Sequence, residues 1–405
     1  MDKHKSLNFN NVITKKTVTS FGKTRDIYVV KDKHTKEFEA MQNINSFLRK
    51  LNLHNHKSVT EITNGIINNL IDLKDKKEFT IVRFDFKSYF YTLSTKYILD
   101  YYIHDKLSKK QIDLFELYSS QVAYTYPGLP ASNTLADIMT NMFVFELSKQ
   151  LQTFGNAYVY SYVDDVVAVL DRCVQKQTII DTINNCVSTI YHQPHDIPNN
   201  TTIHFDDNKF SYLTQTNLPL TFNNLGYEYN LYFGKTGIEF NIGIPKYKKD
   251  NFAQFLGDIV KANYKDVEKL RSLMYIYTRR VVTKVKATDG SGKNVNYCRL
   301  ISSRIVNKYL QYFEKSTIDF LQNVVTKSFK SNNLPLPYYL KDEDKNNGYN
   351  LYHNIVKNRA LVLNKKFGIP YTKLKKLASP VLDTDLTNAN YDDICVQLIK
   401  NIVKI

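Results

Sequence analysis

Tryptophan is absent from the 405 residues of the chain, and cysteine, proline and glycine are scarce, with 4, 10 and 13 copies. So little glycine and proline excludes a fibrous or low-complexity protein. The four cysteines form no CxxC pair, which argues against a structural zinc site or a disulfide framework and favours a reducing compartment. No apolar run reaches the roughly 18 residues of a membrane span, and no apolar segment follows the N-terminus. We therefore expect a cytoplasmic protein that makes no membrane contact.

Positive charge dominates what is present. Lys and Arg number 55 against 39 Asp and Glu, which gives a formal net charge of +16. Such an excess favours a polyanionic partner, most often nucleic acid. Hydrophobic residues make up 43% of the chain, enough for a sizeable core. The 30 Tyr residues suit base stacking, although AT-rich codon usage is the simpler explanation of that count taken alone.

Hydrophobic periodicity predicts an α+β protein. Between residues 81 and 245 strands and helices alternate in a way that is typical of a palm, an antiparallel sheet backed by helices. From about residue 250 onward the pattern is mostly helical and basic. Within that part, residues 284–297 are typical of an exposed loop, and residues 331–349 of a linker that precedes two amphipathic helices, at about 351–366 and 391–404.

Two adjacent aspartates, Asp164 and Asp165, stand between the apolar runs SYV and VVAVL. Neighbouring residues of a regular strand point to opposite faces, so both carboxylates can serve one site only at a turn. Their repulsion calls for a cation, and Mg²⁺ prefers oxygen ligands of this kind. A plain Asp-Asp hairpin turn is the alternative for this segment alone.

A third carboxylate, Asp85, ends another buried strand in the segment FDFKSYF. Antiparallel pairing of the two strands would bring Asp85 beside Asp164. Three carboxylates could then hold two metal ions, one that activates an attacking hydroxyl and one that stabilises a leaving oxygen. That arrangement is typical of phosphoryl or nucleotidyl transfer.

Three motifs, in their order and spacing, resemble those of reverse transcriptases. Residues 84–90 (FDFKSYF) resemble the first catalytic motif of the family, and residues 162–165 (YVDD) resemble its YxDD box. Between them, residues 128–132 (GLPAS) resemble the Gly-Leu-Pro…Ser motif, without the Gln that is common there. The likeness spans about residues 20–245 and is nearest to the prokaryotic group with retron, group II intron, abortive-infection and defence-associated enzymes.

The resemblance implies a right-hand polymerase with fingers, palm and helical thumb. It places N-terminal fingers at residues 1–80 and the palm at 81–245, with a fingers insertion at about 94–125. The helical thumb follows at 246–330, and a linker with a C-terminal helical extension at 331–405.

The resemblance also implies roles for single residues. Asp85, Asp164 and Asp165, with Phe86 as a further ligand, would hold Mg²⁺, or alternatively Mn²⁺. Lys209, in the segment DDNK, would be the general acid that protonates the pyrophosphate leaving group.

Further residues would bind the incoming deoxynucleotide or the nucleic acid. Arg25 would contact the triphosphate, Lys57 lies in a segment similar to the family's "gkS", and Phe90 would be the steric gate that excludes a 2′-hydroxyl. The remaining substrate-binding residues would be Phe86, Tyr89 and Ser132. Those that contact nucleic acid would be Leu225, Gly226 and Tyr227 of the primer grip and Arg279 and Arg280 of the basic thumb. A solvated surface charge is the alternative for each Lys and Arg, and ordinary core for Phe90.

The function implied is RNA-directed DNA synthesis in prokaryotic antiviral defence. The Asn-Ala-x-x-His and Val-Thr-Gly segments of retron enzymes are missing, which favours a defence-associated relative. The expected partners are an RNA template, a DNA product, deoxynucleotides and a dedicated non-coding RNA, with a protein partner or a second copy of the chain left open. A template-independent or protein-primed DNA polymerase is the first alternative. An inactive nucleic-acid-binding scaffold is the second, and the steric gate disfavours an RNA polymerase.

Overall fold

The computed structural model describes residues 7–20, 23–53, 57–193, 201–206, 209–235, 237–286, 292–300, 309–340 and 348–404. The chain forms two compact units. The first comprises Met1–Leu220 and Phe233–Ile238, and the second comprises Thr221–Tyr232 and Glu239–Ile405. Both mix helices with antiparallel strands, so the α+β prediction is confirmed.

The first unit consists of a hairpin, a helical layer and a central sheet. Its helices are α1 (Phe9–Val12), α2 (Lys36–Lys50), α3 (Val59–Asp72), α4 (Tyr89–Thr92), α5 (Thr95–Ile98), α6 (Lys109–Gln121), α7 (Ser132–Leu151) and α8 (Lys176–Ile190). Its strands are β1 (Ile13–Ser20), β2 (Lys23–Val30), β3 (Thr80–Asp85), β4 (Ala157–Tyr162), β5 (Asp165–Leu170) and β6 (Ser211–Thr214). Strand β1, whose sequence ITKKTVTS is largely polar, was not expected from the hydrophobic pattern.

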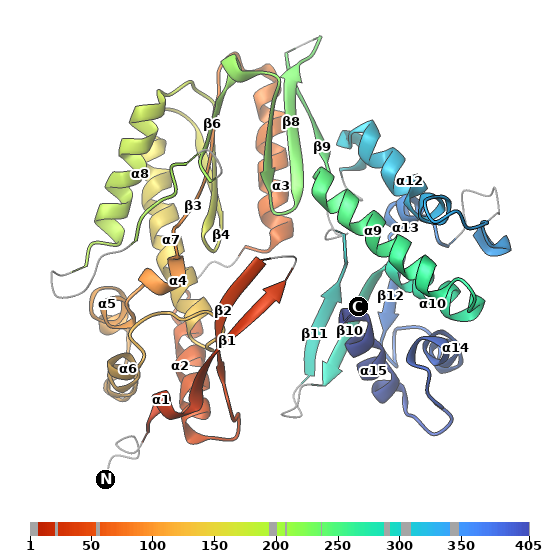
Figure 1. Ribbon diagram of the computed structural model, residues 1–405. Coiled ribbons are helices and arrows are strands. Elements are labelled where there is room, and N and C mark those ends of the chain that lie inside the picture. The colour runs from red at the N-terminus through yellow and green to blue at the C-terminus, as the bar shows by residue number, and fades with distance from the viewer. Residues whose placement is uncertain are drawn as a thin grey trace. The chain divides into compact units, whose positions relative to one another are not determined.

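The central sheet has the strand order β4-β5-β3-β6, and every neighbouring pair is antiparallel. With α7 and α8 the chain runs β3-α7-β4-β5-α8-β6, which is the split β-α-β-β-α-β arrangement. Side chains alternate along these strands, and one face carries an apolar set that includes Val82, Phe84, Val166 and Ala168. This face packs on α7 and α8, which lie against each other beside the sheet (Figure 1).

Helix α3 packs on the sheet at strand β4. It begins with a capping box, in which Ser58 Oγ accepts from Glu61 N–H at 3.2 Å and Glu61 Oε2 accepts from Ser58 N–H at 2.7 Å. Gly65 lies so close to the Tyr160 ring that a Cβ atom there would overlap it. The Tyr160 hydroxyl accepts a hydrogen bond of 2.9 Å from Asn69 Nδ2. The predicted fingers region therefore contains a helix that covers part of the central sheet.

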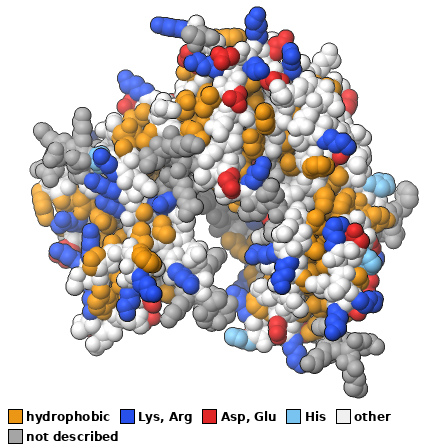
Figure 2. Space-filling view, turned by 180° about the vertical axis from the view of Figure 1, so that it is seen from behind, with side chains coloured by type: hydrophobic (Ala, Val, Ile, Leu, Met, Phe, Trp, Pro, Cys, Tyr) orange, Lys and Arg blue, Asp and Glu red, His pale blue; other side chains and the backbone are white. Residues whose placement is uncertain are grey.

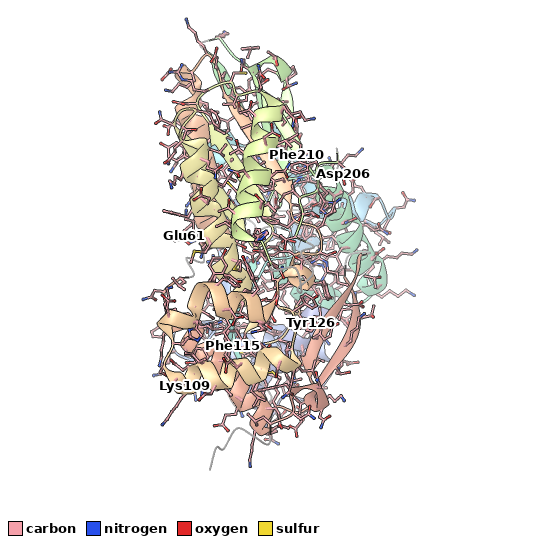
Figure 3. All side chains as sticks on the ribbon, turned by 90° about the vertical axis from the view of Figure 1, so that its left-hand side faces the viewer. Glu61, Lys109, Phe115, Tyr126, Asp206 and Phe210 are labelled. Carbon is pink, nitrogen blue, oxygen red and sulfur yellow. The ribbon has the colours of Figure 1, made fainter. Side chains whose placement is uncertain are left out.

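The helical layer of the first unit is built on aromatic side chains. Phe115 of α6 is completely buried and contacts Phe47 of α2 edge to face, with ring centroids 6.5 Å apart. Figure 3 labels Phe115 together with Lys109, the first residue of the same helix. Lys109 forms an exposed ion pair of 2.8 Å with Asp113 one turn later. The helix thus separates an apolar side from a charged side.

The second unit holds two three-stranded sheets and a set of helices. One sheet has the order β7-β8-β9, from β7 (Leu220–Asn224), β8 (Tyr227–Phe233) and β9 (Ile238–Gly243). The other has the order β11-β10-β12, from β10 (Arg280–Lys286), β11 (Gly292–Tyr297) and β12 (Ala360–Leu363). The helices are α9 (Lys246–Asn263), α10 (Val267–Tyr277), α12 (Lys315–Lys330), α13 (Leu351–Val356), α14 (Tyr371–Leu382) and α15 (Tyr391–Lys404).

The mostly helical pattern predicted from about residue 250 onward leaves out a sheet that joins residues 246–330 to residues 331–405. Strand β10 pairs with β12 in parallel, with Arg280 opposite Ala360 and Thr283 opposite Leu363. The predicted loop at 284–297 is in its described part a hairpin of β10 and β11. The predicted helix at 351–366 ends at Val356, and Ala360–Leu363 joins the sheet instead. The β-branched sequence RVVTKVK explains β10, since such residues favour a pleated surface.

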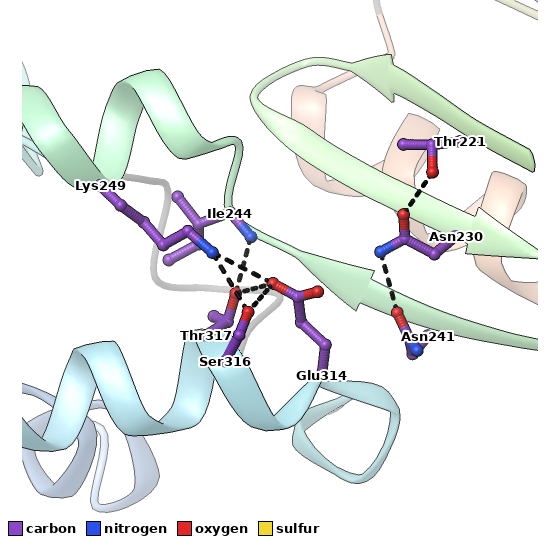
Figure 4. A network of polar contacts seen from close by, with 8 residues as sticks. All are labelled: Thr221, Asn230, Asn241, Ile244, Lys249, Glu314, Ser316 and Thr317. Carbon is purple, nitrogen blue, oxygen red and sulfur yellow. Dashed lines mark hydrogen bonds and ion pairs between the residues drawn. The ribbon is translucent and has the colours of Figure 1, made fainter.

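A polar network stabilises the start of α12 (Figure 4). Glu314, just before the helix, accepts hydrogen bonds from Thr317 Oγ1 at 2.6 Å and from Lys249 Nζ at 3.2 Å. Thr317 Oγ1 in turn accepts from the backbone N–H of Ile244 at 3.0 Å, which ties the helix to the end of β9. The contacts fix α9 and α12 to the same sheet end.

Positive side chains are spread over the face of the molecule that Figure 2 draws. On the face drawn in Figure 2, Lys and Arg side chains are more widespread than Asp and Glu, as the net charge of +16 requires. Among the described helices, none combines the length and the apolar character that crossing a membrane would take.

Candidate active site

The structure brings Asp85 and Asp165 side by side at one end of the central sheet. Asp85 is the last residue of β3, Asp165 is the first of β5, and the two are direct partners in the antiparallel ladder. Directly opposed residues of such a pair project from the same face of the sheet. The backbone N–H of Phe86 donates to the carbonyl oxygen of Asp164 at 3.2 Å, so the β4–β5 turn is held against the end of β3. The predicted antiparallel pairing of these strands is confirmed, with Asp165 as the direct partner of Asp85 and Asp164 next to it in the turn.

Asp164 lies in the tight turn between β4 and β5. The preceding residue, Val163, has a φ of 58°, in the left-handed region that β-branched residues rarely adopt. Its carbonyl oxygen accepts a hydrogen bond of 3.0 Å from Thr140 Oγ1 of α7. The turn breaks the strand alternation, which places the two neighbouring aspartates at the same sheet end.

Two cations lie against these carboxylates. Arg83, two residues before Asp85 on β3, donates from Nε to Asp165 Oδ1 at 3.2 Å and from Nη2 to Asp165 Oδ2 at 3.4 Å. Lys209 Nζ forms a very short ion pair with Asp85 Oδ2. Both carboxylates are mostly buried, whereas the Lys209 side chain is 42% exposed. Arg83 and Lys209 thus offset part of the negative charge.

Asp164 is the aspartate of the site whose charged form is most disfavoured. Burial, and next the Asp85 carboxylate, raise the pKa of Asp164 to about 6. Burial also raises the pKa of Asp165, against the opposing effect of Arg83. Asp85 Oδ1 is buried and has no hydrogen-bond partner among the described residues. A buried carboxylate oxygen without a donor is unfavourable unless a cation reaches it.

The three carboxylates have the chemistry that a divalent cation requires, but their present arrangement does not form a metal site. Carboxylate oxygens are the ligands that Mg²⁺ prefers, and the free Asp85 oxygen and the raised Asp164 pKa both indicate uncompensated charge. Within the part of the chain that the structure describes, however, no three His, Cys, Asp or Glu side chains converge closely enough to hold a metal ion. Both oxygens of Asp165 are turned toward Arg83.

Lys209 is held near the aspartates by hydrogen bonds of its backbone to Asp206. Its backbone N–H donates to Asp206 O at 3.0 Å and to Asp206 Oδ1 at 3.1 Å, and the N–H of Phe210 donates to Asp206 O at 2.8 Å. Figure 3 labels Asp206 and Phe210, which lie on either side of Lys209 in the sequence. The other two residues of the DDNK segment, 207 and 208, lie outside the described residues.

Three predicted substrate-binding side chains are buried under the site. Phe86 and Tyr89 are each 2% exposed and stack with centroids 4.8 Å apart, and Ser132 is fully buried at the start of α7. The Tyr89 hydroxyl is hydrogen-bonded to Thr140 Oγ1 at 2.7 Å. These side chains pack in the core behind the sheet end. Because they are buried, only the backbone of these residues can contact a substrate. Phe90 is half-buried.

The two predicted cations of the fingers have different surroundings. Lys57 is exposed, lies 5.4 Å from the centre of the Tyr160 ring, and lines a small cavity with Tyr162 and Val163 of the YVDD turn. Arg25 is exposed on β2, opposite Val18 in the β1–β2 hairpin. The structure therefore places Lys57 beside the turn that carries the aspartates.

The predicted primer-grip residues form the β7–β8 turn of the second unit. Leu225 and Gly226 have φ values of 47° and 91°, which makes the turn tight, and the Gly226 Cα faces the Lys248 side chain. Tyr227 is 1% exposed. The ring of Tyr227 is thus part of the core, and the turn itself is the accessible part.

Arg279, a predicted nucleic-acid contact of the basic thumb, is buried and lies beyond the end of α10. Arg279 is 8% exposed, stacks 3.5 Å from the centre of the Tyr275 ring and donates from Nη1 to Tyr275 O at 2.9 Å. Burial lowers its pKa. It lies between α10 and β10 because the helix ends at Tyr277, and Arg280, the first residue of β10, is half-buried.

Sequence reasoning missed Arg83, which the structure shows in contact with the site. The signal was available, because Arg83 precedes Asp85 by two residues on a predicted strand, and such residues share a face.

Comparison with known proteins finds matches among solved structures alone: no family model and no curated protein matches the sequence. Telomerase from Candida albicans, in complex with the TWJ fragment of telomeric RNA, is 13% identical over 96% of this chain and 66% of that one, with a TM-score of 0.41. Apo telomerase from Candida tropicalis is 12% identical over 96% and 67%, with a TM-score of 0.40. A form of that enzyme truncated from its C-terminal domain is 14% identical over 56% of this chain and 54% of the other, with a TM-score of 0.37.

Proposed function

We propose that the chain is a nucleotidyltransferase that copies RNA into DNA. The observation that carries the proposal is the opposition of Asp85 and Asp165 across β3 and β5, with Asp164 in the adjoining turn and Lys209 bound to Asp85. Among the functions that the resemblance to reverse transcriptases offers, nucleotidyl transfer makes use of all four groups.

In this proposal Asp85, Asp164 and Asp165 hold Mg²⁺, or alternatively Mn²⁺, once Asp165 leaves Arg83. Bound metal would lower the pKa of a primer 3′-hydroxyl and stabilise the charge on the leaving oxygen. Lys209 lies within reach of Asp85 and would donate a proton to the pyrophosphate. Phe90, half-buried beside Tyr89, would meet the sugar and exclude a 2′-hydroxyl.

The role in prokaryotic defence, the non-coding RNA, the cytoplasmic location and the deoxynucleotide substrates are proposals that the sequence resemblance supports. A template-independent or protein-primed DNA polymerase would use the same carboxylates. Protease treatment of the DNA product distinguishes protein-primed synthesis from the other two. A product whose synthesis began on a tyrosine is attached to protein, so digestion removes that protein and changes the mobility of the product.

A specific observation favours the second candidate, an inactive nucleic-acid-binding scaffold. Arg83 already pairs with both oxygens of Asp165, and no three metal-binding side chains converge among the described residues. A scaffold would need no movement of Asp165.

The test of the polymerase is the paired change Asp164→Ala and Asp165→Ala. We expect loss of deoxynucleotide incorporation on a primed RNA template, because the metal ligands are gone, while the melting temperature holds or rises as carboxylate repulsion is relieved. Asp171→Ala is the control for a carboxylate outside the site, since Asp171 directly follows the far end of β5. Incorporation at the wild-type rate by the double variant would exclude the proposed site.

A further inference from the structure

The second unit contains a cavity of about 330 Å³ between α10 and α14. Its volume lies within the range of about 300–1,000 Å³ that small-molecule sites occupy. Its inner wall is formed by Ser272 and Leu377, which are buried, and by Pro380, which is half-buried. The cavity is therefore open to solvent on one side and closed by packed side chains on the other.

Two tyrosines give the cavity an aromatic wall. Tyr275 of α10 and Tyr349 are both half-buried, with ring centroids 6.3 Å apart and planes at 75°. Arg279 lies against the Tyr275 ring at 3.5 Å and fixes its orientation, while the Tyr349 hydroxyl accepts a hydrogen bond of 3.0 Å from Arg271 Nε. Rings held in this way offer a rigid surface on which a flat base can stack.

Three cations stand at the rim. Arg271, Lys373 and Lys376 are exposed, and Lys373 Nζ lies 5.7 Å from the centre of the Tyr275 ring. Among the described residues none of the three forms an ion pair with a carboxylate, although Glu268 also lines the cavity. The rim therefore keeps a net positive charge that an anionic group can neutralise.

We propose that this cavity binds a nucleotide, with the base against the tyrosines and the phosphate at Arg271, Lys373 and Lys376. Aromatic stacking and clustered cations are the two features that nucleotide recognition combines. The nucleotide could be a free nucleoside phosphate or one unit of a single strand, because both present the same base and phosphate. The cavity lies wholly within the second unit and is separate from the three aspartates.

The experiment measures binding to the full chain in EDTA, which removes the divalent cations that the proposed polymerase site would need. The probes are 8-azido-ATP for photo-crosslinking and a fluorescent single-stranded oligonucleotide for titration. We expect crosslinks to map to the peptides that hold Tyr275 or Tyr349. Each of Lys373→Gln and Lys376→Gln should weaken binding about tenfold, as expected for the loss of a hydrogen bond to a charged group. Glu268→Gln should tighten it, because a repelling carboxylate is removed.

Lys375→Gln is the matched control, since Lys375 lies on the same helix but donates to Thr387 O at 2.9 Å and does not line the cavity. If ATP competes with the probe at one site per chain, the ligand is a free nucleotide. If the oligonucleotide binds and ATP does not compete with it, the ligand is a single strand. Either result supports the proposal. Crosslinks elsewhere, equal effects of Lys375→Gln and Lys373→Gln, or inorganic phosphate competing as well as ATP would each overturn it.

Discussion

Asp164 combines a buried carboxyl group with a nearby like charge, and the two effects give its stability contribution a definite pH dependence. Its pKa in the fold is about 6, above the ordinary value of 3.8. Between about pH 4 and pH 6 the folded chain binds more protons than the unfolded chain. Stability is therefore lost as the pH rises through this window, and the loss persists above it.

Asp164→Asn should consequently raise the free energy of unfolding at pH 7.5, by at most about 3 kcal/mol. The gain should vanish near pH 4, where Asp164 is already protonated. Denaturant unfolding at the two pH values measures it. Asp171→Asn is the control of opposite sign, because hydrogen bonds from Asn156 and Lys76 outweigh burial and lower the pKa of Asp171. A gain of equal size at both pH values would contradict the electrostatic origin.

Arg279 is a structural cation. The residue is 8% exposed, and its guanidinium is held by the Tyr275 ring and carbonyl. Arg279→Gln should lower the free energy of unfolding by about 1–3 kcal/mol, since a cation–π contact and a hydrogen bond are lost. The salt dependence of nucleic-acid binding should stay the same. Lys261→Gln, an exposed change on α9, should leave stability within about 0.5 kcal/mol. A reduced salt slope with unchanged stability would return Arg279 to the nucleic-acid surface.

The β4–β5 turn is the element that places the aspartates, and it does so with a strained residue. Val163 has a φ of 58° and is held by the hydrogen bond from Thr140. Val163→Gly should relieve the strain, which for a non-glycine residue is about 1–2 kcal/mol, although the added freedom of the unfolded chain offsets part of the gain. We expect unchanged or slightly higher stability in thermal unfolding together with lower activity of the proposed polymerase, because the turn becomes less rigid. Thr140→Val, which replaces the hydroxyl with a methyl group and so removes this hydrogen bond, should lower both.

Prediction from sequence succeeded for the strands that carry the aspartates. The apolar runs beside Asp85, Asp164 and Asp165 indicated strands, and the antiparallel pairing of these strands is observed, although the residue directly opposite Asp85 is Asp165. The prediction is wrong at β10, a basic alternating strand in a part of the chain whose pattern predicts helix and loop. It also failed at α14, where Pro370 and Pro380 obscured a helix, although the first precedes the helix and the second lies in its last turn.

Burial was the harder quantity to predict. Tyr89 and Ser132 carry polar atoms and lie in motifs, yet tertiary packing places both in the core. Conversely, the role of Arg83 depends on which residue faces it across the ladder, and that is a property of strand register. One sequence without a register cannot supply such pairings.

The whole molecule carries a charge of +16, which should govern its affinity for nucleic acid. Neutralised phosphates release counterions, so the logarithm of the binding constant should fall with the logarithm of salt concentration by about 0.9 per phosphate on B-form DNA. We expect binding of the full chain to a primed RNA template to weaken by about a thousandfold or more between 50 and 200 mM salt. Fluorescence anisotropy at four salt concentrations measures the slope. A slope near zero would mean that the charge serves another purpose, such as solubility.

The path of the chain between the two units bears on the order in which a ribosome can complete them. The first unit includes Phe233–Ile238, which follow twelve residues of the second. Within the first unit Gly237 approaches the Lys74 carbonyl so closely that a Cβ atom would overlap it. The first unit is therefore finished only after residue 238 has left the exit tunnel, by which time the hairpin of β7 and β8 is already synthesised. Domains that emerge early usually fold early, so a nascent chain would hold the three aspartates in place while most of the second unit is still to be made.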